Sequence, residues 1–366
     1  MTKFNKSSIL YLFLIFAPIS FFLDQFRSDS TLLFLVSIIS LIPLAKLIGD
    51  STEHLASHYG STVGSLLNVT FGNAAEIIIG TIAISAGLID LVKASIIGAI
   101  LGNIMLIFGL SMIVGGLRHK EQSFNRENAG LQSSMIFLSI IGLAIPTLLA
   151  ITVFQSDSVN GETKIQLLSD SVAIILIFVY AAAIIFTFVT HRYLFTYTAH
   201  SNENNTSTSM EIKHWTKRKS FLILGLSMLG VVVVSEILVG SVEETGKNVG
   251  FGEMFVGAII VGIVGNAAEH SSAILLARKG KIDLSIGIAA GSGTQIALFV
   301  VPILVFAGIA LDQPFTLEFT SYELVTLFLA AIILNLIAHD GKSNWFEGVM
   351  LTAVYIVIAL GFYFLG

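Results

Sequence analysis

The residues best suited to chemistry in this chain are two glutamates that lie inside apolar stretches. The pentapeptide Gly-Asn-Ala-Ala-Glu occupies residues 72–76 and returns letter for letter at residues 265–269. Burying a carboxylate in hydrocarbon surroundings is costly, and such groups usually face an interior cavity and mark a path for ions or protons. The repetition predicts one site built from Glu76 and Glu269, with one glutamate from each half of the chain.

Both glutamates have polar companions that carry oxygen: an amide three residues earlier, an amide on the following apolar segment, and one serine. These companions are Asn73, Asn266, Asn103, Gln295 and Ser292. Oxygen ligands without sulfur or imidazole are what Ca²⁺ prefers, at about 6–8 ligands per ion. An amide in a membrane helix also commonly serves as a hydrogen-bonded link to a neighbouring helix. The set predicts an oxygen-lined cation site, with interhelical linkage as the alternative role for the amides.

Three further ionisable residues accompany this set in the sequence. His270 directly follows the second glutamate, whereas Ile77 stands at the matching position of the first motif. A part in proton coupling and a plain packing role both fit a histidine at this place. Glu53 and Glu244 occupy matching positions near the ends of apolar segments. In one interpretation they line an access path for cations, and in the other they are ordinary charges at helix ends.

The composition predicts an all-α polytopic membrane protein. Hydrophobic residues make up 55% of the 366 residues and charged residues 12%, and the mean hydropathy is +0.88. Soluble globular proteins carry about a quarter charged residues. The lipid bilayer is therefore the expected surroundings of the chain, and no nucleic-acid partner is expected.

The sequence offers little for an enzyme. Cysteine is absent, which excludes disulfides, thiolate metal sites and a cysteine nucleophile. We find no His-Glu-x-x-His zinc motif and no serine and histidine paired on adjacent helix faces. We therefore expect neither catalysis nor a bound cofactor.

The hydropathy pattern predicts eleven transmembrane helices. The apolar segments are about 9–23, 31–56, 62–88, 91–117, 129–154, 171–190, 221–242, 254–277, 282–309, 322–338 and 345–364. The first could be a signal peptide, but no small-x-small cleavage site precedes Asp24, so we interpret it as a retained span. Pro43 is expected to break the second segment.

The basic residues predict the orientation in the membrane. Of the 19 Lys and Arg residues, fourteen fall in loops on the side of the N-terminus and four on the opposite side, and Lys46 lies within a predicted span. Loops rich in Lys and Arg stay in the cytoplasm. We therefore expect a cytoplasmic N-terminus and, with eleven spans, a C-terminus that is external or lumenal.

The repeat extends beyond the pentapeptide. Leu-Ile-Gly at residues 47–49 matches Leu-Val-Gly at 238–240, and spans two to six match spans seven to eleven. Because five is odd, the second unit enters the membrane from the opposite face, which makes an inverted repeat with a midplane site between the halves. The predicted parts are a leading helix, a first five-helix repeat, a cytoplasmic linker and a second five-helix repeat, at residues 1–30, 31–190, 191–219 and 220–366.

These features resemble the cation/proton exchanger (CAX) family of the calcium/cation antiporter superfamily. The resemblance rests on the doubled pentapeptide, the span count and the run Gly-Ser-Gly-Thr-Gln-Ile-Ala-Leu-Phe at residues 291–299. It implies that Glu76 and Glu269 are the central carboxylates, with the polar companions around them. Related sodium/calcium exchangers carry Pro-Glu motifs instead, which argues against sodium coupling. The linker departs from members with an acidic helix there, because its only acidic residues are Glu203 and Glu211.

Charge balance predicts the activity. Two ionised glutamates at one site repel each other unless a divalent cation or protons neutralise them, and Ca²⁺ supplies the same charge as two protons. We therefore predict a secondary antiporter that exchanges Ca²⁺, or another divalent cation such as Mn²⁺, for H⁺. Exchange of Na⁺ or K⁺ for H⁺ and a cation channel stay open as alternatives, as do proton stoichiometry and oligomeric state. One protomer is expected to enclose the whole site, with the cation as substrate.

Overall fold

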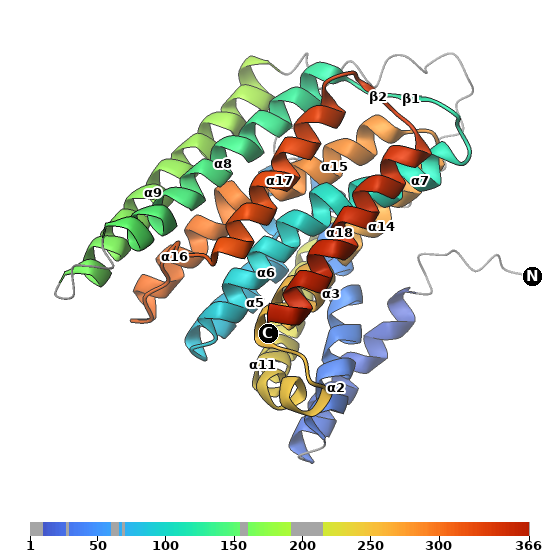
Figure 1. Cartoon of the computed structure of the whole chain (residues 1–366). Helices are drawn as coiled ribbons and strands as arrows, with labels where there is room; N and C mark the ends of the chain where they lie inside the picture. The colour runs from blue at the N-terminus through green and yellow to red at the C-terminus, as the bar shows by residue number, and fades with distance from the viewer. Residues whose placement is uncertain are drawn as a thin grey trace, which may run out of the picture.

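The computed structural model describes residues 10–26, 29–59, 66–67, 70–153, 160–191 and 215–365. Most of the predicted linker and the first nine residues lie outside this part of the chain, including Glu203 and Glu211. Besides helices and the loops that join them, the described residues contain one two-stranded antiparallel sheet of β1 (Gln122–Ser123) and β2 (Lys342–Ser343). Figure 1 shows this small sheet joining two loops at one end of the helical body.

Eight helices in the described part are long and apolar enough to cross a membrane, which confirms the predicted all-helical membrane class. They are α3 (Ser30–Tyr59), α6–η2–α7 (Ile89–Gly116), α8 (Arg126–Thr152), α9–η4 (Gly161–Thr190), α11 (Lys217–Val249), α15–η6–α16 (Ile282–Ala310), α17 (Ser321–Ala338) and α18 (Trp345–Leu365). A bent pair, Glu253–Gly265 with Ala267–Arg278, makes a ninth if it counts as one span. Two shorter apolar helices are Leu10–Gln25, which contains α2 (Phe16–Gln25), and α5 (Ala74–Ser85).

Two helices differ from their predicted form. The prediction that Pro43 breaks the second apolar segment is wrong, because α3 runs through it without interruption. In tightly packed membrane helices, neighbouring helices and hydroxyl side chains can compensate the backbone groups that a proline frees. Helix α9 begins ten residues before the predicted apolar segment, at Gly161 instead of residue 171. A hydrogen bond from Gln166 to Asp170 supports this polar first part of the helix.

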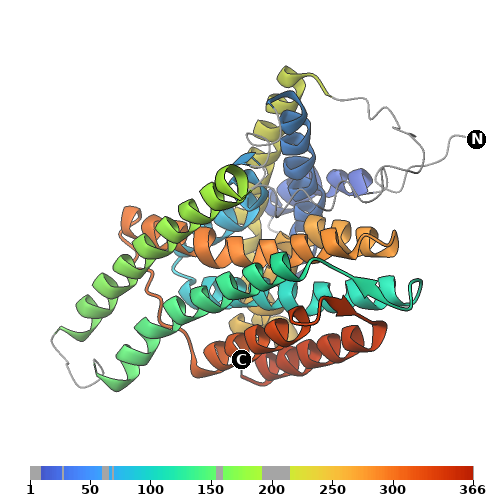
Figure 2. The ribbon, with the colours of Figure 1, turned by 90° about the horizontal axis from the view of Figure 1, so that it is seen from above.

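Helices α3 and α11, which are far apart in the sequence, lie side by side along much of their lengths. Figures 1 and 2 show them together at one side of the molecule, with α8 and α9 at the opposite edge. Leu44 of α3 packs onto Gly230 of α11, where an added Cβ would come 2.9 Å from Leu44 Cδ2. Helix α2 packs against both of them.

The first and second halves touch backbone to backbone in the centre. An added Cβ at Gly98 of α6 (Ile89–Leu101) would come 1.8 Å from the carbonyl oxygen of Ala258 in η5 (Val256–Val261). A Cβ added at Gly262 would come 2.7 Å from the backbone nitrogen of Ala99. Small residues permit this close approach between membrane helices. Among the long apolar spans of the described part, α6–η2–α7 is the most enclosed, with 83% of its most apolar 18 residues buried against 22% for α9–η4.

Candidate cation site

The two copies of the pentapeptide form the same local structure. The helix breaks at Asn73 (φ −95°, ψ 15°) before α5, and at Asn266 (φ −93°, ψ 7°) before α14 (Ala267–Arg278). Glu76 and Glu269 therefore each lie in the first turn of a new helix. Free backbone N–H groups at a helix start favour negative charge nearby, so each break gives its buried carboxylate a suitable position.

The structure brings both glutamates to one cavity of about 810 Å³. Glu76 reaches across to the second motif, because a Cβ added at Gly265 would come 2.9 Å from Glu76 Oε1. In the described part of the molecule, Oε2 of Glu76 and Oε2 of Glu269 are buried without a hydrogen-bond partner. Buried polar atoms are nearly always satisfied in native proteins, so these two oxygens are suited to accept a proton or a cation.

An amide pair connects the first motif to α15 (Ile282–Gln295). Asn73 Nδ2 donates to Gln295 Oε1 at 2.8 Å, and Asn73 is 1% exposed. These two residues are 222 positions apart in the chain. The structure thus places Gln295 beside the first glutamate's motif, although the sequence pairs it with Glu269.

A second network surrounds Asn103, which is fully buried in η2 (Gly102–Ile107). Its Nδ2 donates to Ser292 Oγ at 3.1 Å and to Asn266 Oδ1 at 3.4 Å, and the Ser292 hydroxyl donates to Asn266 Oδ1 at 3.1 Å. His270 Nε2 lies 3.1 Å from Asn103 Oδ1. Since Asn103 Oδ1 has no hydrogen to give, the histidine is the donor.

Three of the amides accept a hydrogen bond at their side-chain oxygen, while each glutamate keeps a buried oxygen without a hydrogen-bond partner. Asn103, Gln295 and Asn266 each have a carbonyl oxygen that already accepts from a neighbouring side chain. Among the described residues, no group of three His, Asp or Glu side chains converges as a metal cluster would. A bound cation would therefore need amide, hydroxyl, backbone or water oxygens besides the two carboxylates.

Two features of this site were not predicted from the sequence. The spans that carry the amides contain π-helical turns, namely η2 and η6 (Ile296–Val300), which follow glycine-rich stretches. Such turns are frequent at functional sites and change which residues face the interior. The second missed feature is the cavity wall, which includes Lys46 and Asp50 of α3. A basic residue inside a predicted span was the available signal for this wall.

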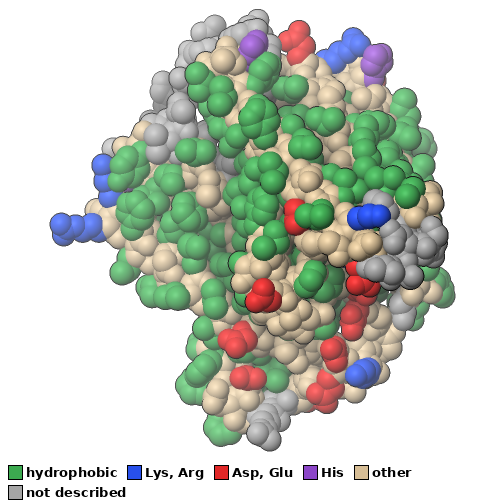
Figure 3. Space-filling view, turned by 90° about the vertical axis from the view of Figure 1, so that its left-hand side faces the viewer, with side chains coloured by type: hydrophobic (Ala, Val, Ile, Leu, Met, Phe, Trp, Pro, Cys, Tyr) green, Lys and Arg blue, Asp and Glu red, His purple; other side chains and the backbone are tan. Residues whose placement is uncertain are grey.

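The two glutamates proposed for an access path lie in different places. Glu53 lines the cavity that reaches Glu76 and Glu269. Glu244 belongs to α11 and lies beside the first residue of α3, Ser30, from which it accepts a hydrogen bond. Figure 3 shows acidic side chains gathered in the lower half of the face in view, at the height where α11 ends in Figure 1. Negative charge at that end attracts cations by its general field.

Comparison with known proteins identifies the family. The sequence profile described as sodium/calcium exchanger protein matches residues 29–189 and 219–364. The chain belongs to this exchanger family. Among its relatives, the Ca(2+)/H(+) antiporter of Aphanothece halophytica is 41% identical over 98% of this chain and 97% of its own. ChaA, the Ca(2+)/H(+) antiporter of Bacillus subtilis strain 168, is 39% identical over 95% of this chain and 96% of its own.

Further relatives confirm the predicted resemblance to cation/proton exchangers. Vacuolar cation/proton exchanger 3 of Oryza sativa is 35% identical over 98% of this chain and 86% of its own. The solved structure of native YfkE superimposes with a TM-score of 0.82 at 35% identity, covering 97% of this exchanger and 99% of YfkE. An H⁺/Ca²⁺ exchanger CAX structure shares the fold, with a TM-score of 0.68 at 16% identity. This exchanger is an integral, multi-pass membrane protein.

Proposed function

We propose that this protein is a secondary antiporter that exchanges Ca²⁺ for H⁺ through one midplane site centred on Glu76 and Glu269. The observation that carries the proposal is the pair of buried carboxylates, each with an open oxygen, on one cavity in an apolar interior. The names of the full-length relatives agree with this activity. Competition between cation and protons for the same oxygens then couples the two fluxes without any chemical reaction.

The charge of the site supplies the coupling. Two ionised carboxylates in a poorly polarisable interior repel each other, and either Ca²⁺ or two protons removes most of that repulsion. An occupied site is nearly neutral and permits the halves to rearrange, whereas the empty charged site resists closure. His270 is part of the proposal as a proton-coupling group, since its Nε2 contacts the amide network at Asn103.

The polar companions complete the proposed coordination shell. They are Asn73, Asn266, Asn103, Gln295 and Ser292; all five are buried or partly buried, and Asn266 lines a pocket together with Glu76. In the present arrangement, hydrogen bonds hold the break at Asn73 against α15 and the break at Asn266 against η2. A cation that enters would draw amide oxygens toward itself, and the hydrogen bonds among the amides would exchange for contacts with the ion.

The proposed architecture has eleven spans, arranged as a leading helix and two inverted five-helix repeats. Eight long helices, the bent pair and the two shorter apolar helices supply that number. The family profile matches two segments, 29–189 and 219–364, that nearly coincide with the proposed repeats at 31–190 and 220–366. The N-terminus is then cytoplasmic, the C-terminus external or lumenal, and residues 191–219 a cytoplasmic linker. One protomer encloses the whole cavity, so it is self-sufficient for exchange.

Uptake into everted membrane vesicles tests the proposed function. A proton gradient, acidic inside, is imposed on vesicles that contain the protein, and uptake of radioactive Ca²⁺ is followed. Parallel assays with Na⁺ and K⁺ measure the alternative cations. We expect Ca²⁺ uptake that collapses when an ionophore dissipates the gradient and that is absent in Glu76→Gln vesicles. Gradient-driven uptake of Na⁺ or K⁺ without Ca²⁺ uptake would reject Ca²⁺ as the substrate.

A further inference from the structure

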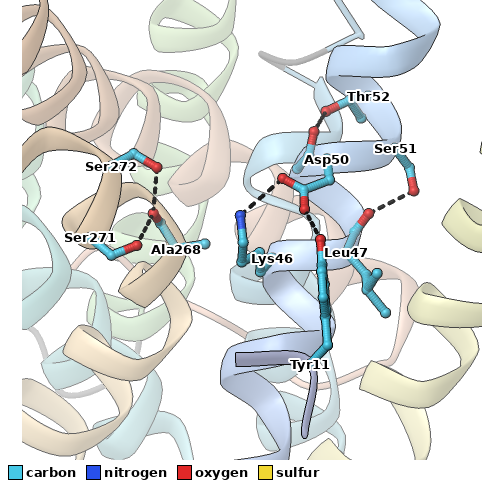
Figure 4. A network of polar contacts seen from close by, with 10 residues as sticks. Tyr11, Lys46, Leu47, Asp50, Ser51, Thr52, Ala268, Ser271 and Ser272 are labelled. Atoms are coloured by element: carbon cyan, nitrogen blue, oxygen red, sulfur yellow. Dashed lines mark hydrogen bonds and ion pairs between the residues drawn. The ribbon is translucent and has the colours of Figure 1, made fainter. Parts of the chain in front are cut away.

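The cavity that reaches the two glutamates has two basic residues on its wall, the exposed Lys279 and the enclosed Lys46. Helix α3 contributes Lys46, Asp50 and Glu53 to this wall, and α14 contributes Ala268 and Ser272. Figure 4 shows Lys46 projecting from α3 on the side that faces the helix of Ala268 and Ser272. A positive charge on the path of a cation repels the substrate. The ammonium group of Lys46 therefore opposes the entry of a cation unless it is held away from the path.

Asp50 has two partners, one for each oxygen of its carboxylate. Lys46 Nζ lies 3.0 Å from Asp50 Oδ1, one turn along the same helix. The hydroxyl of Tyr11, in the leading helix, donates a hydrogen bond to the other carboxylate oxygen, Oδ2. The side chains of Lys46 and Asp50 are only 19% and 22% exposed. Both oxygens of Asp50 are thus engaged, and the ammonium is held at the wall of the cavity.

An ordinary surface ion pair in this protein looks different. Lys247 and Glu243 of α11 are also one turn apart, but their charged atoms are separated by 3.9 Å and their side chains are 79% and 57% exposed. Such exposed pairs contribute little to stability. The pair on α3 is shorter and more enclosed, and a third residue from another helix fixes its carboxylate. These differences indicate that Lys46, Asp50 and Tyr11 form a specific, ordered arrangement and not an ordinary surface ion pair.

We propose that Lys46 is a tethered cation that sets the affinity of the cavity for the transported cation. Asp50, held by Tyr11, keeps the ammonium at the wall and away from Glu76 and Glu269. Lysine carries its charge on a flexible four-carbon stem, so an ammonium released by Asp50 can move into the cavity and compete with the incoming cation for the glutamates. This inference rests on the proposed antiport and adds a residue set that tunes it.

The tether predicts effects of opposite sign on the half-saturating Ca²⁺ concentration at the cytoplasmic face. Lys46→Met removes the competing charge and lowers that concentration. The expected change is about fourfold, the effect of one unit charge at about 10 Å from a divalent ion in water. Tyr11→Phe changes no charge but loosens Asp50, and so raises the concentration. In the Lys46→Met background, Tyr11→Phe has no effect, because no ammonium remains to be released.

The experiment measures initial Ca²⁺ uptake by everted vesicles over a range of external Ca²⁺ for wild type, Lys46→Met, Lys46→Gln, Tyr11→Phe and the double variant of Lys46→Met with Tyr11→Phe. Lys247→Met, in the surface pair, serves as the control and keeps the wild-type value. Thermal stability of each purified variant is measured in detergent. A structural role alone would lower stability or maximal rate without these changes in half-saturation.

Each outcome bears on one of the two proposals. A lower half-saturating concentration in Lys46→Met, together with a Tyr11→Phe effect that depends on Lys46, supports the tether. An unchanged or higher value in both Lys46→Met and Lys46→Gln overturns it, as does a Tyr11→Phe effect of equal size in both backgrounds. Wild-type vesicles that fail to exchange Ca²⁺ for H⁺ reject the proposed antiport itself, which is a separate result.

Discussion

Glu76 of the first motif lies against Gly265 of the second, so close that a Cβ at the glycine would come 2.9 Å from Oε1 of the carboxylate. The glycine of one pentapeptide therefore makes room for the glutamate of the other. The cation site proposed here depends on this placement, because a larger residue would displace the charged group from its cavity.

Gly265→Ala tests that relationship. The added methyl group meets only the end of a flexible side chain, so we expect the fold to persist while Glu76 shifts. A misplacement of about 1 Å at a reacting group can cost about 100-fold, and we expect Ca²⁺/H⁺ exchange to fall by at least tenfold. Gly287→Ala, where an added Cβ meets nothing within 4 Å, is the matched control and is expected to retain wild-type exchange.

Glu76→Gln and Glu269→Gln are each expected to abolish exchange in a folded protein. Glutamine keeps the shape of the side chain but cannot carry a charge that alternates between cation and proton. Uptake by purified variants in proteoliposomes, with monodispersity as the check on folding, measures the effect. Glu121→Gln is the control, since this side chain is 77% exposed in a loop. Normal flux in either site variant would falsify the site assignment.

Asn103→Leu and Gln295→Leu separate a ligand role from interhelical linkage. If the amides help replace the hydration shell of Ca²⁺, leucine weakens Ca²⁺ binding, because an apolar group cannot compensate the dehydration of the ion. Lost hydrogen bonds between membrane helices cost about 0.6 kcal/mol each on average. We expect both an increase in half-saturating Ca²⁺ and, at Asn103 with its several partners, the larger drop in melting temperature. A lower melting temperature with unchanged half-saturation would assign the amides to packing alone.

Gly98→Ala is expected to destabilise the contact between the two halves. The new Cβ would come 1.8 Å from a backbone carbonyl oxygen of Ala258, so the backbones of α6 and η5 must separate. Overpacking typically costs about 1–3 kcal/mol, which thermal unfolding in detergent would detect. Gly225→Ala, where an added Cβ meets nothing within 4 Å, controls for the substitution itself. Equal melting temperatures for the two variants would contradict this tight contact.

Reporter fusions at the two ends of the chain test the proposed orientation. The fourteen-to-four bias of basic residues predicts a cytoplasmic N-terminus and an external C-terminus. A reporter that is active only in the cytoplasm should therefore work at the N-terminus, and one that is active only outside should work at the C-terminus. Two termini on the same side would require an even number of spans and would contradict the inverted repeat.

The sequence by itself determined the class of the protein, its family and the residues most worth attention. Apolar segments must be helical in a membrane, because their backbone groups have no water to bond, so composition and hydropathy were enough to predict an all-helical membrane protein. The repeated pentapeptide was equally informative, since identical local sequences form the same break at Asn73 and at Asn266. Both predictions depend on interactions within one segment.

Only the tertiary structure decided how the segments face each other. The pairing of Asn73 with Gln295, the donation from His270 to Asn103 and the place of Lys46 on the cavity wall join or orient different helices. The π-helical turns at η2 and η6 change which residues face inward. The rotation and crossing of membrane helices depend on packing against neighbours, and hydropathy carries no information about that packing. For the same reason, the sequence did not distinguish Glu53 from Glu244, which occupy matching positions in the repeat. Glu53 lines the cavity, whereas Glu244, in α11, lies beside the start of α3.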